Sequence, residues 1–238
     1  MFNRRNLLIA GVAAAVLIGA GRLILGPAAL AEPAVVVPAP SVDKVAGDGP
    51  QTVVLAGGCF WGVQAVFQHT KGVLKAVSGY AGGEKKDANY ETVSLGRTRH
   101  AESVEVTFDP KVISYGTILQ IYFSVAHDPT EVDRQGPDEG PQYRSAIFAG
   151  DEAQQAIAAA YISQLDRSGV FKQPIATKVG GLNGFYAAED YHQDYATLHP
   201  ENPYIVYNDL PKIENLKRLF PDRYRPTPAL VTANSKTN

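Results

Sequence analysis

The 238-residue sequence contains one cysteine, Cys59, and also only one methionine and one tryptophan. A single thiol excludes an intramolecular disulfide and any zinc or redox motif of the CxxC type. The 22 Lys and Arg residues do not exceed the 24 Asp and Glu residues. The chain therefore lacks the positive surplus that a polyanion requires, and we expect no nucleic-acid partner. With 45% hydrophobic residues, the composition is that of a globular chain, and the length suits one catalytic domain with appendages.

The N-terminal region lacks an apolar run long enough to be an ordinary transmembrane helix. Arg4 and Arg5 precede the apolar stretch 7–20, which is shorter than the roughly 20 residues that span a bilayer. Residues 29–31 (Ala-Leu-Ala) give the small-x-small pattern of a signal-peptidase site. The paired arginines resemble a twin-arginine signal. We therefore expect residues 1–31 to be a signal peptide and the protein to be periplasmic or otherwise exported, with an uncleaved N-terminal membrane anchor as the alternative.

The rest of the chain divides by composition and periodicity, without an internal repeat. Residues 32–50 are rich in Pro and Ala and predict an extended linker. Residues 51–207 alternate strand and helix patterns and predict the catalytic domain, whereas residues 208–238 predict an extended, irregular C-terminal tail. The pattern predicts an α+β (α/β layered) fold, with a mixed β-sheet and flanking helices. Strands are expected at 52–56, 73–80, 102–108, 143–149 and 175–179, and helices after Cys59, at 114–126 and at 151–166.

The reactive chemistry is concentrated in the segment Gly57-Gly58-Cys59-Phe60-Trp61-Gly62, between a predicted strand and a predicted helix. A cysteine at the first turn of a helix lies among unpaired backbone N–H groups at the positive end of the dipole, which favours the thiolate. Phe60 and Trp61 offer aromatic walls suited to a thioether-like methyl group. We therefore expect a nucleophilic Cys59; a small buried cysteine among core aromatics is the alternative from the local sequence alone.

A second candidate is a glutamate on the apolar side of a predicted strand. In the segment 102–108, alternation places Glu102 on the same face as Val104 and Val106, whereas Glu105 lies on the polar face. Burial disfavours the charged form of a carboxyl group and so keeps it protonated near neutral pH. Glu102 is therefore a candidate general acid.

These motifs, in this order, resemble the peptide methionine sulfoxide reductase A family. The GCFWG motif is followed by segments similar to that family's blocks over roughly residues 51–207. The resemblance implies a ferredoxin-like core and a single-cysteine type of the enzyme. The matching segments are Ser78-Gly79-Tyr80-Ala81-Gly82-Gly83, His100-Ala101-Glu102, Val112-Ile113-Ser114-Tyr115, His127-Asp128-Pro129-Thr130, Gln142-Tyr143-Arg144-Ser145 and Ala188-Glu189-Asp190-Tyr191-His192-Gln193.

The resemblance implies thiol-dependent reduction of the S epimer of methionine sulfoxide, free or in peptides and proteins. Cys59 would attack the sulfoxide sulfur and become a sulfenic acid, and Glu102 would be the catalytic acid. The enzyme would thereby repair oxidised exported proteins. The substrate-binding residues that the resemblance implies are the aromatic pair, two tyrosines that bond the sulfoxide oxygen and an aspartate that shapes the pocket: Phe60, Trp61, Tyr80, Tyr143 and Asp138.

Recycling of the enzyme must be external, because the sequence offers no second cysteine to resolve a sulfenic acid. We expect no bound cofactor, an external thiol reductant and, as partner, an exported thiol or a thioredoxin- or glutaredoxin-like protein. We expect small thiols or a glutaredoxin-like protein to act better than thioredoxin alone. The protein is expected to be a monomer.

Two positions near the predicted site residues differ from the family pattern, and three histidines lie in the matching segments. Arg99 stands where the family commonly has glycine and Pro137 where it commonly has asparagine, and both flank site residues. His100, His127 and His192 share no metal-ligand spacing, so we expect no metal and structural roles for all three. A thiol peroxidase and a non-catalytic domain that binds oxidised peptides are the competing functions.

Overall fold

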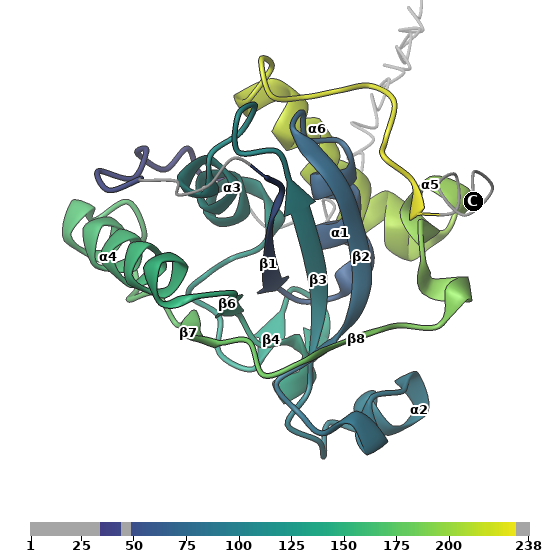
Figure 1. Cartoon of the computed structure of the whole chain (residues 1–238). Helices are drawn as coiled ribbons and strands as arrows, with labels where there is room; N and C mark the ends of the chain where they lie inside the picture. The colour runs from purple at the N-terminus through teal and green to yellow at the C-terminus, as the bar shows by residue number, and fades with distance from the viewer. Residues whose placement is uncertain (1–33, 44–48, 232–238) are drawn as a thin grey trace, which may run out of the picture.

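The computed structural model describes residues 34–43 and 49–231, and its helices surround one central sheet (Figure 1). The elements alternate between strands and helices along the chain. In chain order they are β1 (Gln51–Ala56), α1 (Phe60–Gln68), β2 (Val73–Ala81), α2 (Tyr90–Val93), β3 (Ala101–Phe108), α3 (Tyr115–Ile121), β4 (Arg134–Gln135), β5 (Asp138–Glu139), β6 (Ala146–Ala149), α4 (Glu152–Ser168), β7 (Lys178–Gly181), β8 (Phe185–Ala187), α5 (Tyr195–Leu198) and α6 (Leu210–Leu219).

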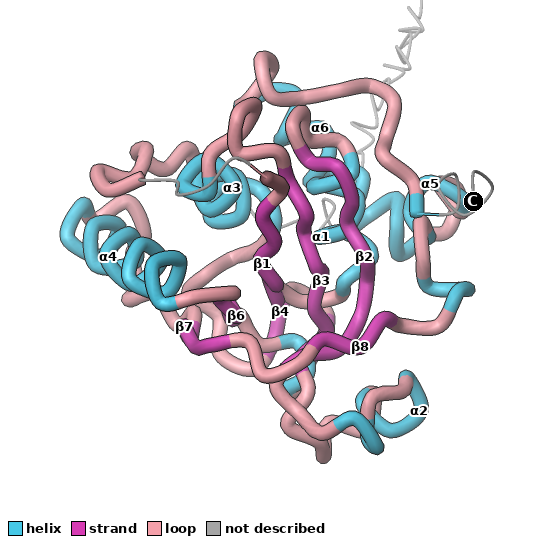
Figure 2. The backbone as a smooth tube through the Cα atoms, viewed as in Figure 1, coloured by secondary structure: helices cyan, strands magenta, loops and turns pink. Residues whose placement is uncertain are grey.

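The central sheet has six strands in the order β7-β6-β1-β3-β2-β8. Only the β6–β7 pair is parallel, so the sheet is mixed. The inner strands β6-β1-β3-β2, joined by α1 and α3, have the order of a ferredoxin-like core, and Figure 2 shows them side by side. The predicted α+β fold is therefore confirmed. A separate hairpin joins β4 to β5.

Burial follows the sequence pattern in the strands that carry the site. The side chains of Val53, Val54 and Leu55 are fully buried in β1, as expected of a central strand covered on both faces. In β3, Val104, Val106 and Phe108 are buried while Glu105 and Thr107 are partly exposed, so the predicted alternation is confirmed. Glu102 therefore lies on the buried face of the sheet.

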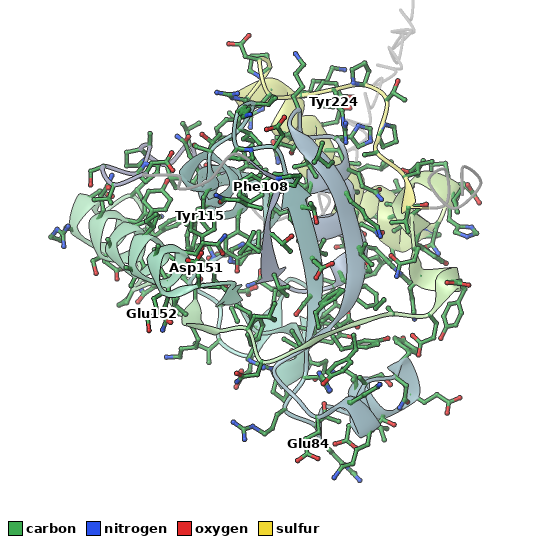
Figure 3. All side chains as sticks on the ribbon, in the orientation of Figure 1. Glu84, Phe108, Tyr115, Asp151, Glu152 and Tyr224 are labelled. Atoms are coloured by element: carbon green, nitrogen blue, oxygen red, sulfur yellow. The ribbon has the colours of Figure 1, made fainter. Side chains whose placement is uncertain are left out.

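The helix predictions are confirmed, and two strand predictions need shifting. Helix α4, whose start is marked by the labelled side chains of Asp151 and Glu152 in Figure 3, is capped where the Asp151 carboxylate accepts the Gln154 N–H at 2.7 Å. The helix predicted over 114–126 ends as a π-turn at 122–126. The strand predicted from 143 begins at 146, because Pro141–Tyr143 form a 3₁₀ turn. The strand predicted at 175–179 lies at 178–181.

The predicted linker and tail both pack on the domain. Residues 34–43 are extended, but Val37 is fully buried and the Tyr161 hydroxyl donates to the Pro38 carbonyl at 2.6 Å. The tail prediction is wrong for α6, which packs against α1 and buries Leu216. Its apolar positions recur at helical spacing and need a partner surface, which α1 supplies. The folded unit therefore continues beyond residue 207.

The expected signal peptide at 1–31 lies outside the described residues. Within residues 34–43 and 49–231, no helix has the length and apolar character needed to cross a membrane.

Candidate active site

A cavity of about 190 Å³ opens at the N-terminus of α1. It brings together Cys59, the residue that precedes the helix, and Glu102 from the buried face of β3. Of the seven predicted site residues, six line the cavity and one, Tyr80, does not. The lining residues are Cys59, Phe60, Trp61, Tyr90, Glu102, Asp138, Tyr143 and Tyr204.

Glu102 is a buried acid tied directly to the helix that carries the cysteine. Its side chain is 3% exposed, and Oε2 accepts the backbone N–H of Phe60 at 3.1 Å. Burial, with smaller contributions from the nearby carboxylates of Asp138 and Asp209, raises the pKa of Glu102 to about 8 against the opposing effect of the Phe60 N–H. Glu102 is therefore mostly protonated at neutral pH, as a general acid must be.

Cys59 lies at the predicted helix terminus, but its surroundings favour the thiol over the thiolate. Burial raises the pKa of Cys59 well above its ordinary value, and the charges of Glu102 and Asp209 add to the rise. The Trp61 N–H in the first turn lowers the pKa, as expected of a helix N-terminus, but it is outweighed. The prediction of a resting thiolate is therefore wrong, because the sequence does not reveal the desolvation or the surrounding carboxylates.

Phe60 and Trp61 form the aromatic wall that the sequence predicts. Phe60 is buried, whereas Trp61 stacks on Tyr195 with ring centroids 3.9 Å apart and planes at 10°. The indole N–H of Trp61 donates to Nδ1 of His192 at 3.2 Å, and Tyr204 meets the indole edge-on. These contacts hold one apolar face of the indole beside Cys59, which suits a methyl group attached to sulfur.

Three phenols surround the cavity, of which the sequence identified only Tyr143. Tyr90 comes from the start of α2, and Tyr204 precedes the π-turn at 205–209. The Tyr204 hydroxyl donates a very short hydrogen bond to Oδ2 of Asp138, which fixes both side chains on one wall. No hydrogen bond within the described part of the chain engages the hydroxyl of Tyr90 or Tyr143. These two phenols are therefore available to a bound oxygen atom.

Tyr80 is not in the cavity, contrary to the prediction. Its side chain is fully buried beneath the sheet edge, and its hydroxyl donates to Oε2 of Glu189 at 2.9 Å. The other oxygen of Glu189 accepts the backbone N–H of Tyr90 at 2.9 Å. Tyr80 thus lies behind the residue that anchors Tyr90. Tyr90 could have been found from the helix start that Asn89 marks, since the Asn89 side chain accepts the Thr92 N–H. Tyr204 lies in a stretch without periodicity, so no sequence pattern pointed to it.

The histidines contact protein groups. His127 is buried, its Nε2 lies 2.7 Å from the Ser145 hydroxyl, and burial lowers its pKa to about 3. Nε2 of His100 contacts the Glu84 carbonyl, and His192 accepts from Trp61. Among the described residues, no group of His, Cys, Asp and Glu side chains is arranged to hold a metal ion.

The two departures from the family pattern, Arg99 and Pro137, are outside the cavity lining but are linked to residues next to it or part of it. The carbonyl of Arg99 accepts Nη2 of Arg144 at 2.7 Å, which joins the start of β3 to the residue after Tyr143. Pro137 lies in the turn between β4 and β5, directly before Asp138. Both positions can therefore affect the placement of a cavity side chain: Arg99 that of Tyr143 and Pro137 that of Asp138.

Comparison with known proteins identifies the chain. Residues 51–224 match the family model described as peptide methionine sulfoxide reductase. Peptide methionine sulfoxide reductase MsrA 2 of Mesorhizobium japonicum is 59% identical over 194 residues, which cover 82% of this chain and 100% of that protein. MsrA of Thermus thermophilus is 46% identical over 176 residues, covering 74% of this chain and 98% of that protein.

Solved structures agree with the sequence relatives. The reduced form of Mxr1 from Saccharomyces cerevisiae superposes with a TM-score of 0.62 at 32% identity, over 68% of this chain and 92% of that chain. Methionine sulfoxide reductase A of Corynebacterium diphtheriae gives a TM-score of 0.56, also at 32% identity, over 74% of this chain and 89% of that chain. The chain belongs to the peptide methionine sulfoxide reductase family and is an oxidoreductase that reduces methionine sulfoxide.

Proposed function

We propose that the protein reduces the S epimer of methionine sulfoxide through a sulfenic acid on Cys59, with Glu102 as the catalytic acid. The observation that carries this proposal is a buried carboxyl group, its pKa raised by burial, in the same cavity as the lone cysteine and an aromatic wall. A sulfoxide offers a methyl group, a sulfur and a basic oxygen. The cavity offers Trp61, Cys59 and Glu102 as the corresponding partners.

In the reductive step the sulfur of Cys59 attacks the sulfoxide sulfur while Glu102 donates its proton to the sulfoxide oxygen. The attack forms an S–S bond; that bond and the S–O bond of the substrate then break as the oxygen is transferred to the Cys59 sulfur, and methionine leaves as the thioether. The proton from the Cys59 thiol restores Glu102, so one sulfoxide and one thiol give one thioether and one sulfenic acid. The hydroxyls of Tyr90 and Tyr143 are proposed to hold the oxygen in line during transfer.

Recovery of the enzyme requires two external thiols. The first attacks the Cys59 sulfenic acid, releases water and leaves a mixed disulfide. The second attacks that disulfide, which frees the Cys59 thiol and forms a disulfide between the two reductants. We propose an exported thiol, or a thioredoxin- or glutaredoxin-like protein, as the reductant, with small thiols or a glutaredoxin-like protein acting better than thioredoxin alone.

A substrate panel tests the reaction. The protein is incubated with dithiothreitol and, in separate reactions, with each sulfoxide epimer of a blocked methionine or with hydrogen peroxide. Conversion of the S epimer alone supports the proposal, whereas faster consumption of peroxide supports a thiol peroxidase. Binding of oxidised peptide without conversion of either epimer supports the non-catalytic alternative and overturns the proposed mechanism.

The proposed site of action is outside the cytoplasm, where the enzyme would repair exported proteins. The sequence features that support export are Arg4, Arg5 and the Ala-Leu-Ala pattern at 29–31. Fractionation of cells that express the full chain tests it, since a double Arg4→Lys and Arg5→Lys variant is expected to remain in the cytoplasm. Unchanged export of that variant contradicts the twin-arginine proposal.

A further inference from the structure

The side chain of Arg144 joins two segments that carry cavity residues. Nη1 donates to the carbonyl oxygens of Pro141 at 2.8 Å and His100 at 3.0 Å, and Nη2 donates to that of Arg99 at 2.7 Å. In the described part of the chain, Arg144 forms no ion pair with an acid. The guanidinium therefore holds backbone groups together and does not neutralise a carboxylate.

The two joined segments carry the proposed acid and one of the phenols. Glu102 is the second residue of β3, just after the two carbonyls, and Tyr143 directly precedes Arg144. Both side chains line the active-site cavity. Among the described residues, no other hydrogen bond links residues 140–144 to residues 99–102. Arg144 is therefore the polar link between the turn that carries the phenol and the strand that carries the acid.

The local backbone leaves the space that this link needs. Gly82 has φ +92°, and a Cβ atom there would lie 3.0 Å from Nη2 of Arg144 and 3.1 Å from the Arg99 oxygen. A side chain at position 82 would crowd the hydrogen bond between these two groups, and the positive φ favours glycine. A guanidinium presents five donors in a rigid plane, and its charge strengthens the bonds that it donates. Lysine, with one ammonium group on a flexible stem, cannot reproduce this geometry.

Tyr143 depends on its backbone for its position in the cavity. The hydroxyl of Tyr204 is fixed by its bond to Asp138, whereas the hydroxyl of Tyr143 forms no hydrogen bond within the described residues. Besides side-chain packing, the link from Arg144 to β3 therefore determines where the Tyr143 hydroxyl lies relative to the Glu102 carboxyl. A misplacement of about 1 Å among reacting groups can cost about 10²-fold in rate, so this link bears on the reaction.

We propose that Arg144 is a positioning residue: its guanidinium holds the Tyr143 hydroxyl at the place where it and the Glu102 carboxyl reach the same sulfoxide oxygen. The inference rests on the proposed function, in which Tyr143 binds that oxygen and Glu102 protonates it. Arg144 does not line the cavity, so it acts through the two segments that it joins.

A double-mutant cycle on substrate binding tests the proposal. The Kd of the S epimer of a blocked methionine sulfoxide is measured by titration calorimetry in the full chain carrying Cys59→Ser, in which no turnover is expected. Adding Arg144→Met is expected to raise Kd roughly three- to tenfold, the scale of one weakened hydrogen bond. After Tyr143→Phe has removed the hydroxyl, the same Arg144→Met change is expected to raise Kd by less than about twofold.

A matched control separates positioning from a loss of stability. Arg225 also joins two segments through backbone carbonyls, since Nε donates to the oxygen of Gln68 at 2.8 Å and Nη2 to that of Val73 at 3.0 Å. Gln68 is the last residue of α1, at the end away from Cys59. Arg225→Met is expected to lower the melting temperature, as Arg144→Met does, and to leave Kd unchanged.

Equal weakening of binding with and without the Tyr143 hydroxyl, or no weakening by Arg144→Met, overturns the proposal. If circular dichroism shows that Arg144→Met does not fold, Arg144→Lys takes its place in the cycle, with the same expected outcomes, because it keeps the charge but cannot span both segments. The cycle measures binding and not turnover. Turnover of methionine sulfoxide by Cys59→Ser would instead contradict the proposed function, so the two failures are distinguishable.

Discussion

The cavity wall that carries Cys59 and Glu102 is held by the core of the fold, whereas the wall that carries the phenols comes from segments outside it. Helix α1 and strand β3 are central elements joined by the hydrogen bond from the Phe60 N–H to Glu102. Tyr90 lies on α2, which projects away from the sheet in Figure 1. Tyr143 follows the small β4–β5 hairpin, and Tyr204 precedes α6.

The difference indicates how the two walls keep their geometry. The reacting pair depends on buried apolar packing, which is insensitive to any one polar contact. The phenols depend on a few hydrogen bonds, such as that from the Tyr90 N–H to Glu189 and that from Tyr204 to Asp138. Substitutions on the first wall should therefore affect the chemical step, whereas those on the second should affect the position of the substrate.

The largest expected effect is that of Cys59→Ser. Serine is close in size, but its hydroxyl is a far weaker nucleophile than a thiol and cannot form a sulfenic acid, so no turnover of methionine sulfoxide is expected. The melting temperature is expected to stay near that of wild type, which circular dichroism measures. Turnover of methionine sulfoxide by this variant would show that Cys59 is not the nucleophile.

Glu102→Gln is expected to slow the reductive step by roughly 10² to 10⁴, because the amide keeps the shape but cannot deliver a proton. In wild type the step requires the protonated acid, so its rate should fall as pH rises through about 8, the pKa of Glu102. This alkaline limb should be lost in Glu102→Gln, as measured by single-turnover kinetics. Glu105→Gln, on the opposite face of β3, is the matched control and should behave as wild type.

Tyr143→Phe and Tyr90→Phe are each expected to lower kcat/KM about tenfold, the effect of one lost hydrogen bond of about 1.4 kcal/mol to the sulfoxide oxygen. The loss should appear with the S epimer of a blocked methionine sulfoxide in steady-state assays. Tyr207→Phe, an exposed tyrosine beside the cavity segment, controls for loss of a phenol elsewhere. Wild-type kinetics in both site variants would show that the oxygen is held by other groups.

The smallest expected effect is that of Glu189→Ala, which releases the Tyr90 N–H and the Tyr80 hydroxyl. We expect KM to rise roughly three- to fivefold with little change in kcat, since one positioning hydrogen bond contributes about 1 kcal/mol. A double-mutant cycle with Tyr90→Phe checks the route, because the effect of Glu189→Ala should shrink once the phenol is absent. An undiminished effect would mean that Glu189 acts on another part of the cavity.

The sequence predicted the wall of Cys59 and Glu102 better than the wall that carries the phenols, for a physical reason. Alternation in 102–108 reports burial on a regular strand, so the face of Glu102 could be read from the residues alone. Residues 82–100 and 202–209 lack such periodicity, so Tyr90 and Tyr204 were missed and Tyr80 was chosen in place of Tyr90. The protonation of Cys59 was also beyond the sequence, because it depends on carboxylates brought together from β3, β5 and the start of α6.

The packing of α6 and of residues 34–43 shows the same limit. Neither segment has a sequence pattern that predicts which surface it packs against, yet Val37 and Leu216 are fully buried against the domain. A short helix is marginal alone and forms because a complementary apolar surface is present. Such a surface is assembled from residues far apart in the sequence, so a local pattern does not reveal it.

Trp61 gives the cavity an optical property. It is the only tryptophan of the chain, and its ring is stacked on Tyr195, bonded to His192 and exposed to the cavity on the side of Cys59. Indole emission depends on local polarity and on nearby quenching groups, so all tryptophan fluorescence of the protein originates beside the reacting sulfur. Substrate entry, oxidation of Cys59 and its recovery by thiols can therefore be followed in real time without a label.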